Sequence, residues 1–476
     1  MRRAGWIRGG LVLCVGVAGG CSNPDPANDG DGGGTSPVTS LSAGSSDPDS
    51  AGTDHATSAG TMGPGTNPGT GPGTTEGEDE TGPSIIFDVN SAIDVGNPEG
   101  CNCGNIIGFS YIWIANSTQS TVTKLNTQTM VEEGRYLTRS DSNGNPSRTS
   151  VTIDSRAVAV ANRNGGVVKV WARPEFCDPL NNGVPGLQTS NDANYLPWGE
   201  DDCVAWFVPF AYNTQRPVAW GPGTLNLQTC EWEDQVLWTG GCQTGVNTWA
   251  QVHRIDGETG VVLDTIDVNG FECSSLSPYG AAIDPVGDYW MTNLVPGQDR
   301  LAHIDVGGNL VEVIVPPITP YGMTVDSQGR VWLESWIGSG NASAARYDPS
   351  DGSWALANNH VANAMSGIQE DALGRMWMNY WTYDGDGTNP GLVWIDGETM
   401  EVSAPFGIGC GPSSCRGLSV DLDGNVWSTS MAQNMAFRFD PDTGTVDTYN
   451  QLVGPYTYSD MTGWALQNST CLPPEG

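Results

Sequence analysis

Aromatic and polar side chains recur at matching positions of a repeat in the C-terminal part of the chain, which indicates a binding face. Tyrosine follows proline in three units, and arginine stands at the matching position of another. Aromatic rings stack on sugars and peptides, while amides and guanidinium groups hydrogen-bond to them. The alternative is that such residues satisfy backbone groups of neighbouring loops. The candidate ligand-binding residues are Tyr279, Asn293, Tyr321, Glu334, Asn379, Arg416 and Tyr456.

Residues that could catalyse a reaction are scarce. The chain has 4 histidines, of which His55 lies in a polar linker. The others, His253, His303 and His360, fall near the third or fourth strands of their units or in loops. The sequence contains no Ser-His-Asp set, phosphate-binding loop or zinc-protease helix. We therefore predict no catalytic residues and expect a binding protein rather than an enzyme.

Calcium is the cofactor that the sequence suggests. Asp178 and Asn182 occupy positions 1 and 5 of a calcium loop, although Leu180 interrupts the pattern at position 3. Asp384 and Asp386 form a second candidate, for which an acidic turn without metal is the alternative.

The cysteines predict an oxidising compartment. Of 12 cysteines, Cys14 falls in an N-terminal export signal and Cys21 directly after it, which leaves an even number suited to five disulfides. The closely spaced pairs predict three bridges, Cys177–Cys203, Cys230–Cys242 and Cys410–Cys415. Cys101 and Cys103 should each reach a distant partner, with Cys273 and Cys471 remaining; a zinc site at Cys101 and Cys103 is the alternative.

A repeat must position all these residues. One unit runs from Pro278 through Asp284 and Gly287 to Trp290, and the next repeats it at the same spacing from Pro320 to Trp332. Related frames end at Trp377 and Trp427. Each unit reads as a strand, a tight Asp/Gly turn and a second strand entered through tryptophan, and a later turn adds two more strands.

The repeat predicts an all-β fold, a seven-bladed β-propeller of four-stranded blades. Successive tryptophans lie mostly 42 to 52 residues apart, which is typical of propeller blades. Residues 172–235 interrupt the spacing, and we expect a disulfide-stapled insertion there. The frame that begins at Pro455 and Tyr456 stops after Trp464, so the C-terminal strand should complete the first blade and close the ring.

The frame of Pro278-Tyr279-Gly280, Asp284, Gly287 and Trp290 resembles the repeat of the virginiamycin B lyase (streptogramin lyase) family, and more loosely NHL-type and gluconolactonase-like propellers. The resemblance covers about residues 107–464. It implies a propeller, and in lyase members histidine and glutamate act with a divalent metal to open a cyclic ester.

This chain departs from the family where that chemistry would need it. The family's histidine positions hold Tyr279, Tyr321, Ser366, Arg416 and Tyr456, none of which is a base near neutral pH. Glu334, the nearest acid, sits one residue before the family's position, so alternation along a strand turns it to the other side of the sheet. The sequence therefore favours a binding module for a glycan, peptide or protein partner. The alternatives are a metal-dependent lyase or lactonase, and a structural envelope protein.

The N-terminal part predicts export and anchoring. Residues 1–20 combine an arginine-rich start with a short apolar run, as a signal peptide does, and the small residues before Cys21 resemble a lipobox. Secretion without a lipid is the alternative. Residues 21–83 read as a disordered tether because they hold scarcely any large apolar side chain, and residues 84–476 as the folded domain. A net charge of −35 argues against binding to nucleic acid or to an anionic membrane surface. We therefore expect the protein to contact the membrane only through its lipid anchor.

Overall fold

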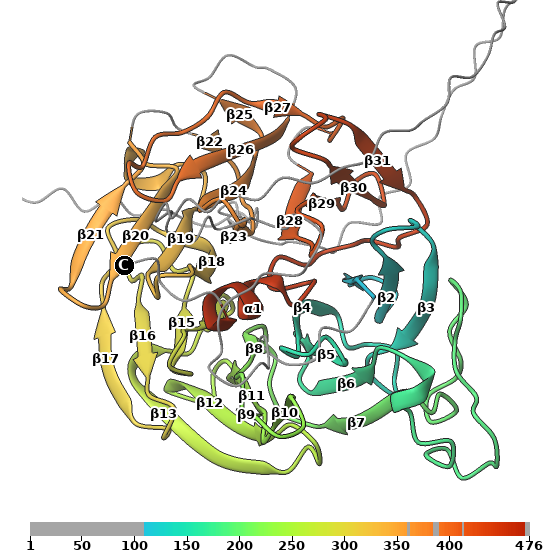
Figure 1. The fold of residues 1–476 in the computed structure, drawn as a ribbon. Coiled ribbons are helices and arrows are strands. Elements are labelled where there is room, and N and C mark those ends of the chain that lie inside the picture. Colours follow the sequence, from blue (N-terminus) through green and yellow to red (C-terminus); the bar gives the residue numbers. More distant parts are fainter. Residues whose placement is uncertain (1–108, 359–361, 384–389, 412–413, 472–476) are drawn as a thin grey trace, which may run out of the picture. The chain divides into compact units, whose positions relative to one another are not determined.

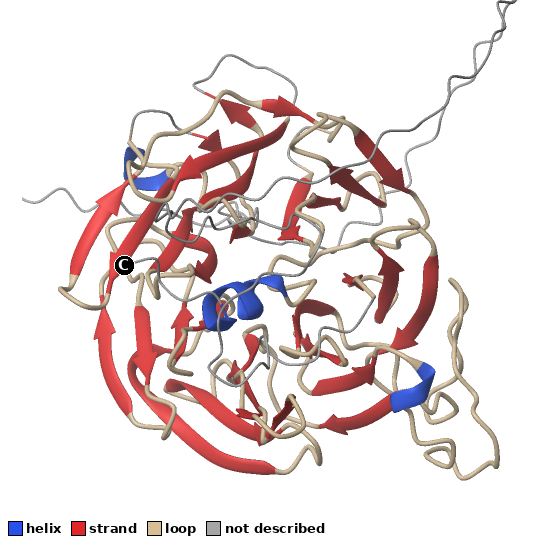
Figure 2. Cartoon of the chain, viewed as in Figure 1, coloured by secondary structure: helices blue, strands red, loops and turns tan. Residues whose placement is uncertain are grey.

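The computed structural model describes residues 109–358, 362–383, 390–411 and 414–471. Seven sheets of three or four strands are arranged in a ring, whose centre we call the channel (Figure 1). Almost all the regular structure is strand (Figure 2). The predicted seven-bladed β-propeller is confirmed. Among the described residues, no helix is long and apolar enough to span a bilayer.

Each blade is an antiparallel sheet, and in blades 2 to 7 its first strand lies nearest the channel. Blade 1 contains β1 (Tyr111–Asn116), β2 (Thr121–Asn126) and β3 (Glu132–Leu137). Blade 2 contains β4 (Pro146–Val151), β5 (Ala157–Asn162), β6 (Val167–Trp171) and β7 (Val204–Val208), and blade 3 contains β8 (Val218–Trp220), β11 (Val236–Gly241), β12 (Trp249–Asp256) and β13 (Val262–Glu272). Blade 4 contains β14 (Gly280–Ile283), β15 (Tyr289–Thr292), β16 (Leu301–Ile304) and β17 (Leu310–Ile314).

The remaining blades repeat the same order. Blade 5 contains β18 (Pro320–Val325), β19 (Val331–Ser335), β20 (Ala344–Asp348) and β21 (Ser353–Leu356). Blade 6 contains β23 (Ile368–Glu370), β24 (Arg375–Tyr380), β26 (Gly391–Asp396) and β27 (Phe406–Gly407), and blade 7 contains β28 (Cys415–Val420), β29 (Val426–Ser430), β30 (Met435–Phe439) and β31 (Val446–Tyr449). Two short ribbons lie outside the blades, β9 (Thr224–Asn226) with β10 (Glu231–Glu233), and β22 (Ala362–Asn363) with β25 (Thr382–Tyr383).

The Asp, Gly, Trp frame is a hydrogen-bonded turn. In blade 5, Asp326 Oδ1 accepts the backbone N–H groups of Gln328 and Arg330, and its Oδ2 accepts the indole N–H of Trp332 at 2.8 Å. Equivalent indole bonds form in blades 4, 6 and 7. The frame glycine has a positive φ, 81° at Gly329, which only glycine adopts readily. The repeat therefore marks the turn between the first two strands of a blade.

The frame tryptophans join neighbouring blades. Trp290, Trp332 and Trp427 are fully buried. Trp290 packs with side chains of blade 5, Trp332 with those of blade 6, and Trp427 with Ile112 and Ile114 of blade 1. Because each indole is buried against the next sheet, the ring is held by the same residue type at successive junctions.

The C-terminal segment closes the ring, as the sequence predicts. Residues 454–461 run beside β1: Ser117 N–H bonds to the carbonyl of Gly454, Tyr456 N–H to that of Ala115, and Trp113 N–H to that of Met461. These bonds, of 2.8 to 3.1 Å, give blade 1 its innermost strand. The chain then forms the helix α1 (Trp464–Cys471) in place of a further strand.

Helix α1 lies across the centre of the ring (Figure 1). Its Trp464 donates its indole N–H to the carbonyl of Glu370 at 2.8 Å, and Gln467 donates to the carbonyl of Ile153 at 2.7 Å. Both acceptors lie where the innermost strands end or just beyond. The helix therefore covers the channel at that end, which we call the α1 end.

The disulfides correct one predicted pair. Cys177–Cys203 and Cys410–Cys415 are confirmed. The prediction for Cys230–Cys242 is wrong, because Cys242 bonds to Cys273, which lies beside it in blade 3. Cys230 and Cys471 are disulfide-bonded as well. Cys101 and Cys103 lie outside the described residues. These bridges indicate an oxidising, extracytoplasmic compartment.

The segment 172–235 is two excursions rather than one insertion. Residues 172–203 form a loop that Cys177–Cys203 closes, and Asp202 holds it by accepting the backbone N–H groups of Asn182 and Gln188. Strands β7 and β8 follow and belong to blades 2 and 3. The β9–β10 ribbon is the second excursion.

Candidate functional site

Four tyrosines meet in the channel, at the end opposite α1. Tyr279 comes from blade 4, Tyr321 from blade 5, and Tyr456 and Tyr458 from the closing segment of blade 1. The hydroxyl of Tyr456 lies 2.6 Å from that of Tyr321, 2.9 Å from that of Tyr458 and 3.2 Å from that of Tyr279. Blades 1 and 4 are not neighbours in the ring, so their side chains can touch only at its centre. We call this group the tyrosine cluster.

Four arginines surround the tyrosine cluster. Arg148 of β4 lies over the ring of Tyr458, with its Cζ 3.2 Å from the ring centroid. The Cζ of Arg163, which follows β5, lies 4.1 Å from the ring centroid of Tyr456. Arg216, which precedes β8, faces Tyr279 at 5.2 Å, and Arg416 of β28 donates to the hydroxyl of Tyr321 at 3.1 Å.

The arginines set the ionisation of the cluster. Burial alone would raise the pKa of Tyr458, but Arg148, Arg163 and Arg216 outweigh it and lower that pKa below its ordinary value. Burial, together with the neighbouring phenols, raises the pKa of Tyr321. Burial and the charge of Arg163 lower the pKa of Arg216. Three positive charges thus act on one phenol.

Glu334 lies between blades 5 and 6 and is fully buried. Its Oε2 accepts the backbone N–H of Ser366 at 3.2 Å. Burial raises the pKa of Glu334 well above its ordinary value, against the backbone bonds from Ser366 and Gly322. It makes no ion pair with an arginine among the described residues.

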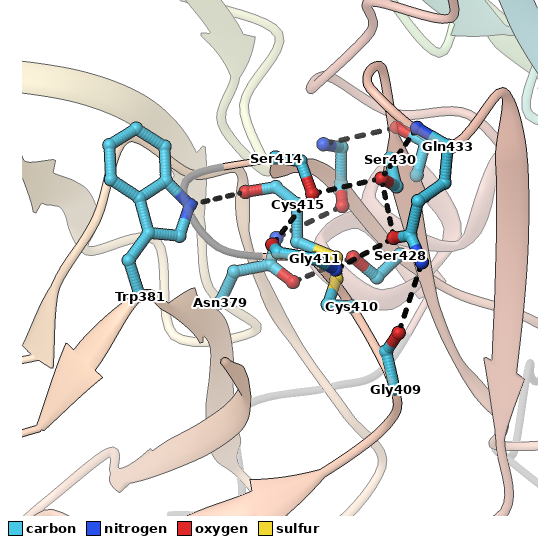
Figure 3. Close-up of a disulfide and its surroundings, with 12 residues drawn as sticks. Asn379, Trp381, Gly409, Cys410, Gly411, Ser414, Cys415, Ser428, Ser430 and Gln433 are labelled. Atoms are coloured by element: carbon cyan, nitrogen blue, oxygen red, sulfur yellow. Dashed lines mark hydrogen bonds between the residues drawn. A yellow bond between two sulfur atoms is a disulfide. The ribbon is translucent and has the colours of Figure 1, made fainter. Parts of the chain in front are cut away.

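Two of the candidate ligand-binding residues are tied into the protein itself. Asn379 donates to the carbonyl of Gly417 and accepts from Ser428 Oγ, which links blades 6 and 7 beside the Cys410–Cys415 disulfide (Figure 3). Asn293 accepts the backbone N–H of Arg300 within its own blade. The structure thus brings Tyr279, Tyr321, Arg416 and Tyr456 together and leaves these two asparagines apart.

The described histidines are not in the channel. His253 of β12 bonds to Tyr212 and Thr265, and burial lowers its pKa to about 4. His303 of β16 stacks on Trp290 and lies 2.9 Å from Asp288. His360 lies outside the described residues.

Among the described residues, one group of three acidic or histidine side chains has ligand atoms close enough to hold a metal. It consists of Asp284, Asp288 and His303, whose atoms lie within 4.8 Å of one another. Asp284 already accepts the indole N–H of Trp290, and Asp288 accepts the backbone N–H of Val306. Both aspartates therefore already serve as hydrogen-bond acceptors within blade 4.

The predicted calcium residues lie elsewhere. Asp178 Oδ1 accepts the backbone N–H of Leu180, and Asn182 Oδ1 accepts that of Val184. Both oxygens therefore stabilise turns of the 172–203 loop. Asp384 and Asp386 lie outside the described residues. Calcium binding in the loop stays a prediction.

An open groove lies between blades 2 and 3. It has a volume of about 300 Å³ and is lined by Trp171, Trp220 and Trp232, with carboxylates on its rim. Trp171 and Trp232 are half-buried, while Trp220 lies beneath them in the core. We call it the tryptophan groove; its further lining includes Asp154, Lys169, Glu233, Asp234, Gln235 and Glu258.

Sequence reasoning missed Arg148, Arg163, Arg216, Tyr458 and the tryptophan groove. Two signals could have found part of the set. Tyr458 lies two residues after Tyr456, so both point to the same side of an extended segment. Arg216 precedes Pro217 at the start of blade 3 as Ser277 precedes Pro278 in blade 4. Arg216 therefore lies two residues before the position that holds Tyr279 in blade 4.

The comparisons with known proteins concern the fold. No family model and no curated protein matches the chain. A solved protein of unknown function from Desulfotomaculum acetoxidans has a TM-score of 0.50 at 13% identity, covering 74% of this chain and 100% of that one. Virginiamycin B lyase is also a structural neighbour. The Staphylococcus aureus enzyme has a TM-score of 0.46 at 15% identity, covering 68% and 92%. BamB from Moraxella catarrhalis has 0.40 at 10%, covering 74% and 85%. At such identities the likeness shows the fold alone.

Proposed function

We propose that the protein is an extracytoplasmic binding module, anchored through Cys21, whose tryptophan groove captures a neutral glycan. The groove carries the proposal because Trp171 and Trp232 present half-buried indoles beside carboxylate and amide groups. Indole faces stack on sugar rings, and the polar rim can bond to hydroxyl groups. The acidic rim and the net charge of −35 disfavour an anionic ligand in this groove.

Binding of neutral oligosaccharides tests the proposal. Titration of the purified protein should change its tryptophan fluorescence in a saturable way, and Trp171→Ala or Trp232→Ala should weaken affinity about tenfold or more. Trp394→Ala is the matched control, since Trp394 is a half-buried indole of blade 6 outside the groove. Equal affinity in all three variants, or binding of peptides alone, would contradict the proposal.

The lyase alternative has a separate test. Tyr279, Tyr321, Tyr456 and Arg416 stand at positions where the resembled family has histidine, and such phenols and guanidinium groups do not readily take a proton at neutral pH. We expect no opening of quinupristin, with or without magnesium, beyond the uncatalysed rate when substrate and product are separated by chromatography. Turnover that Glu334→Gln abolishes would support the lyase instead.

A further inference from the structure

We propose that the channel binds an oxyanionic group, a carboxylate, sulfate or phosphate, through Arg148, Arg163 and Arg216. This site is distinct from the tryptophan groove and goes beyond the proposed function. It lies in the channel beside the tyrosine cluster, whereas the groove lies between blades 2 and 3.

The three guanidinium groups carry unused donors. Arg148 is 1% exposed and Arg163 is 6% exposed. Each uses one nitrogen, Arg148 Nη1 on the carbonyl of Ser147 and Arg163 Nη1 on Asn145 Oδ1. Within the described part of the chain, no acceptor meets Arg148 Nη2, the Nε and Nη2 of Arg163, or the Nε of Arg216.

The charges are unbalanced at this point of an acidic protein. The chain holds 54 acidic residues, yet none of those described forms an ion pair with these three arginines. Arg163 and Arg216 are close enough for each to act on the other's charge. A buried cation without a counter-charge is strongly unfavourable. An oxyanion would supply that charge and accept forked N–H bonds from guanidinium groups.

The partial exposure of Arg216 indicates the end of the channel from which a ligand would enter. A cavity of about 40 Å³, with room for about three waters, lies between the innermost strands and α1, and none of the three arginines lines it. Arg216 is half-buried and donates to the carbonyl of Ser275, so the site meets solvent at the end away from α1. The oxyanion therefore enters from that end, either free or as the charged end of a larger molecule.

The protein's own phenol is the rival counter-charge. The three arginines lower the pKa of Tyr458, and a phenolate there would neutralise one of the three charges. Near-ultraviolet absorbance at neutral pH distinguishes the two cases, because phenolate and phenol absorb differently.

The test is anion binding to the full chain, measured by calorimetry at matched ionic strength against sodium chloride. The probes are phosphate, sulfate, acetate, and the pair glucuronate and glucose. The variants are Arg163→Gln and Arg216→Gln. Arg300→Gln is the control, because it removes one charge from a half-buried arginine of blade 4 whose Nη1 meets the carbonyl of Asp299.

Wild type and Arg300→Gln should bind at least one oxyanion saturably, and the two channel variants about tenfold more weakly or worse. Competition by glucuronate would identify a carboxylate on a larger ligand, and competition by phosphate or sulfate alone a free oxyanion. Equal affinity in the channel variants, no saturable binding, or a wild-type phenolate unaffected by anions would overturn the inference. Arg216→Gln carries the test if Arg163→Gln fails to fold. Glucose binding that the channel variants retain, without any anion binding, would leave the proposed function standing alone.

Discussion

At the scale of single residues, the frame aspartates combine two tasks. Asp421 Oδ1 accepts the backbone N–H groups of Asp423 and Asn425, and its Oδ2 accepts the indole N–H of Trp427 at 2.7 Å. One carboxylate thus shapes the turn and orients the indole that packs against the next blade. Burial raises its pKa, which shows that these bonds only partly offset the loss of water.

Removing one such carboxylate should destabilise the whole ring. Asp421→Ala leaves a buried indole N–H and two backbone N–H groups without acceptors, and we expect a loss of about 2 to 3 kcal/mol. Urea unfolding followed by tryptophan fluorescence measures it. Asp423→Ala is the control, because its exposed carboxylate accepts only a surface bond from Gln128. An equal loss from both variants would contradict the role of the frame.

Glu370 should make stability depend on pH. Burial, aided by the charge of Asp326, raises its pKa to about 7 from 4.5. The folded state therefore holds its proton more tightly than the unfolded state does. This tighter proton binding adds to the free energy of unfolding. The added stability is complete below about pH 4.5 and is lost as pH rises through about 7, with an upper limit of about 3 kcal/mol.

Glu370→Gln tests this dependence. The variant should lose less stability than wild type between pH 5 and pH 8, measured by urea midpoints. Glu401→Gln changes an exposed carboxylate and should follow wild type. Parallel curves for wild type and Glu370→Gln would show that Glu370 is not the titrating group.

At the scale of elements, the C-terminal segment joins closure and channel. Residues 454–461 bond to β1 and also supply Tyr456 and Tyr458 to the channel. Helix α1 then covers the opposite end, where Asn468 donates to Glu370 Oε2 at 2.5 Å. The segment that closes the ring therefore also supplies two of the side chains at its centre.

Two truncations separate the closing segment from the helix. A chain that ends after Val453 lacks both, and it should aggregate or melt much earlier because β1 becomes an exposed sheet edge. A chain that ends after Thr462 keeps the closing segment and should melt between the first and wild type. Both truncated chains lack Cys471, so a difference between their melting temperatures comes from the closing segment. Equal melting temperatures would contradict closure by this segment.

At the scale of the whole molecule, disulfides close loops in or beside blades 2, 3 and 7. All eight cysteines within the described residues are disulfide-bonded. Titration of thiols in the denatured, unreduced domain from residue 84 onward should find almost none. Two or more free thiols per chain would contradict five bridges.

The repeat made the fold predictable, because the Asp, Gly, Trp frame is a local turn whose geometry depends on a few residues close in sequence. Ring closure was predictable for the same reason, since residues 455–464 repeat the first half of the frame. The Cys242–Cys273 bridge was not, because it depends on which loops meet in blade 3.

The channel site could be predicted only in part. Tyr279, Tyr321, Tyr456 and Arg416 share a repeat position and were found together. The arginines of blades 2 and 3 occupy no such common position, and only the closed ring brings them to the tyrosines. Asn293 and Asn379 follow the tryptophans of their frames, but each bonds to backbone groups. Asn293 bonds within its own blade and Asn379 to the neighbouring blade.

The position of the closing segment also bears on how the protein reaches its folded state. Synthesis from the N-terminus produces β1 more than 300 residues before residues 454–461. Until residues 454–461 are available, blade 1 lacks its innermost strand and the channel lacks two of its four tyrosines. A prematurely ended chain would keep an unpaired edge that invites proteolysis or aggregation. The ring can therefore close only in chains that extend through residues 454–461.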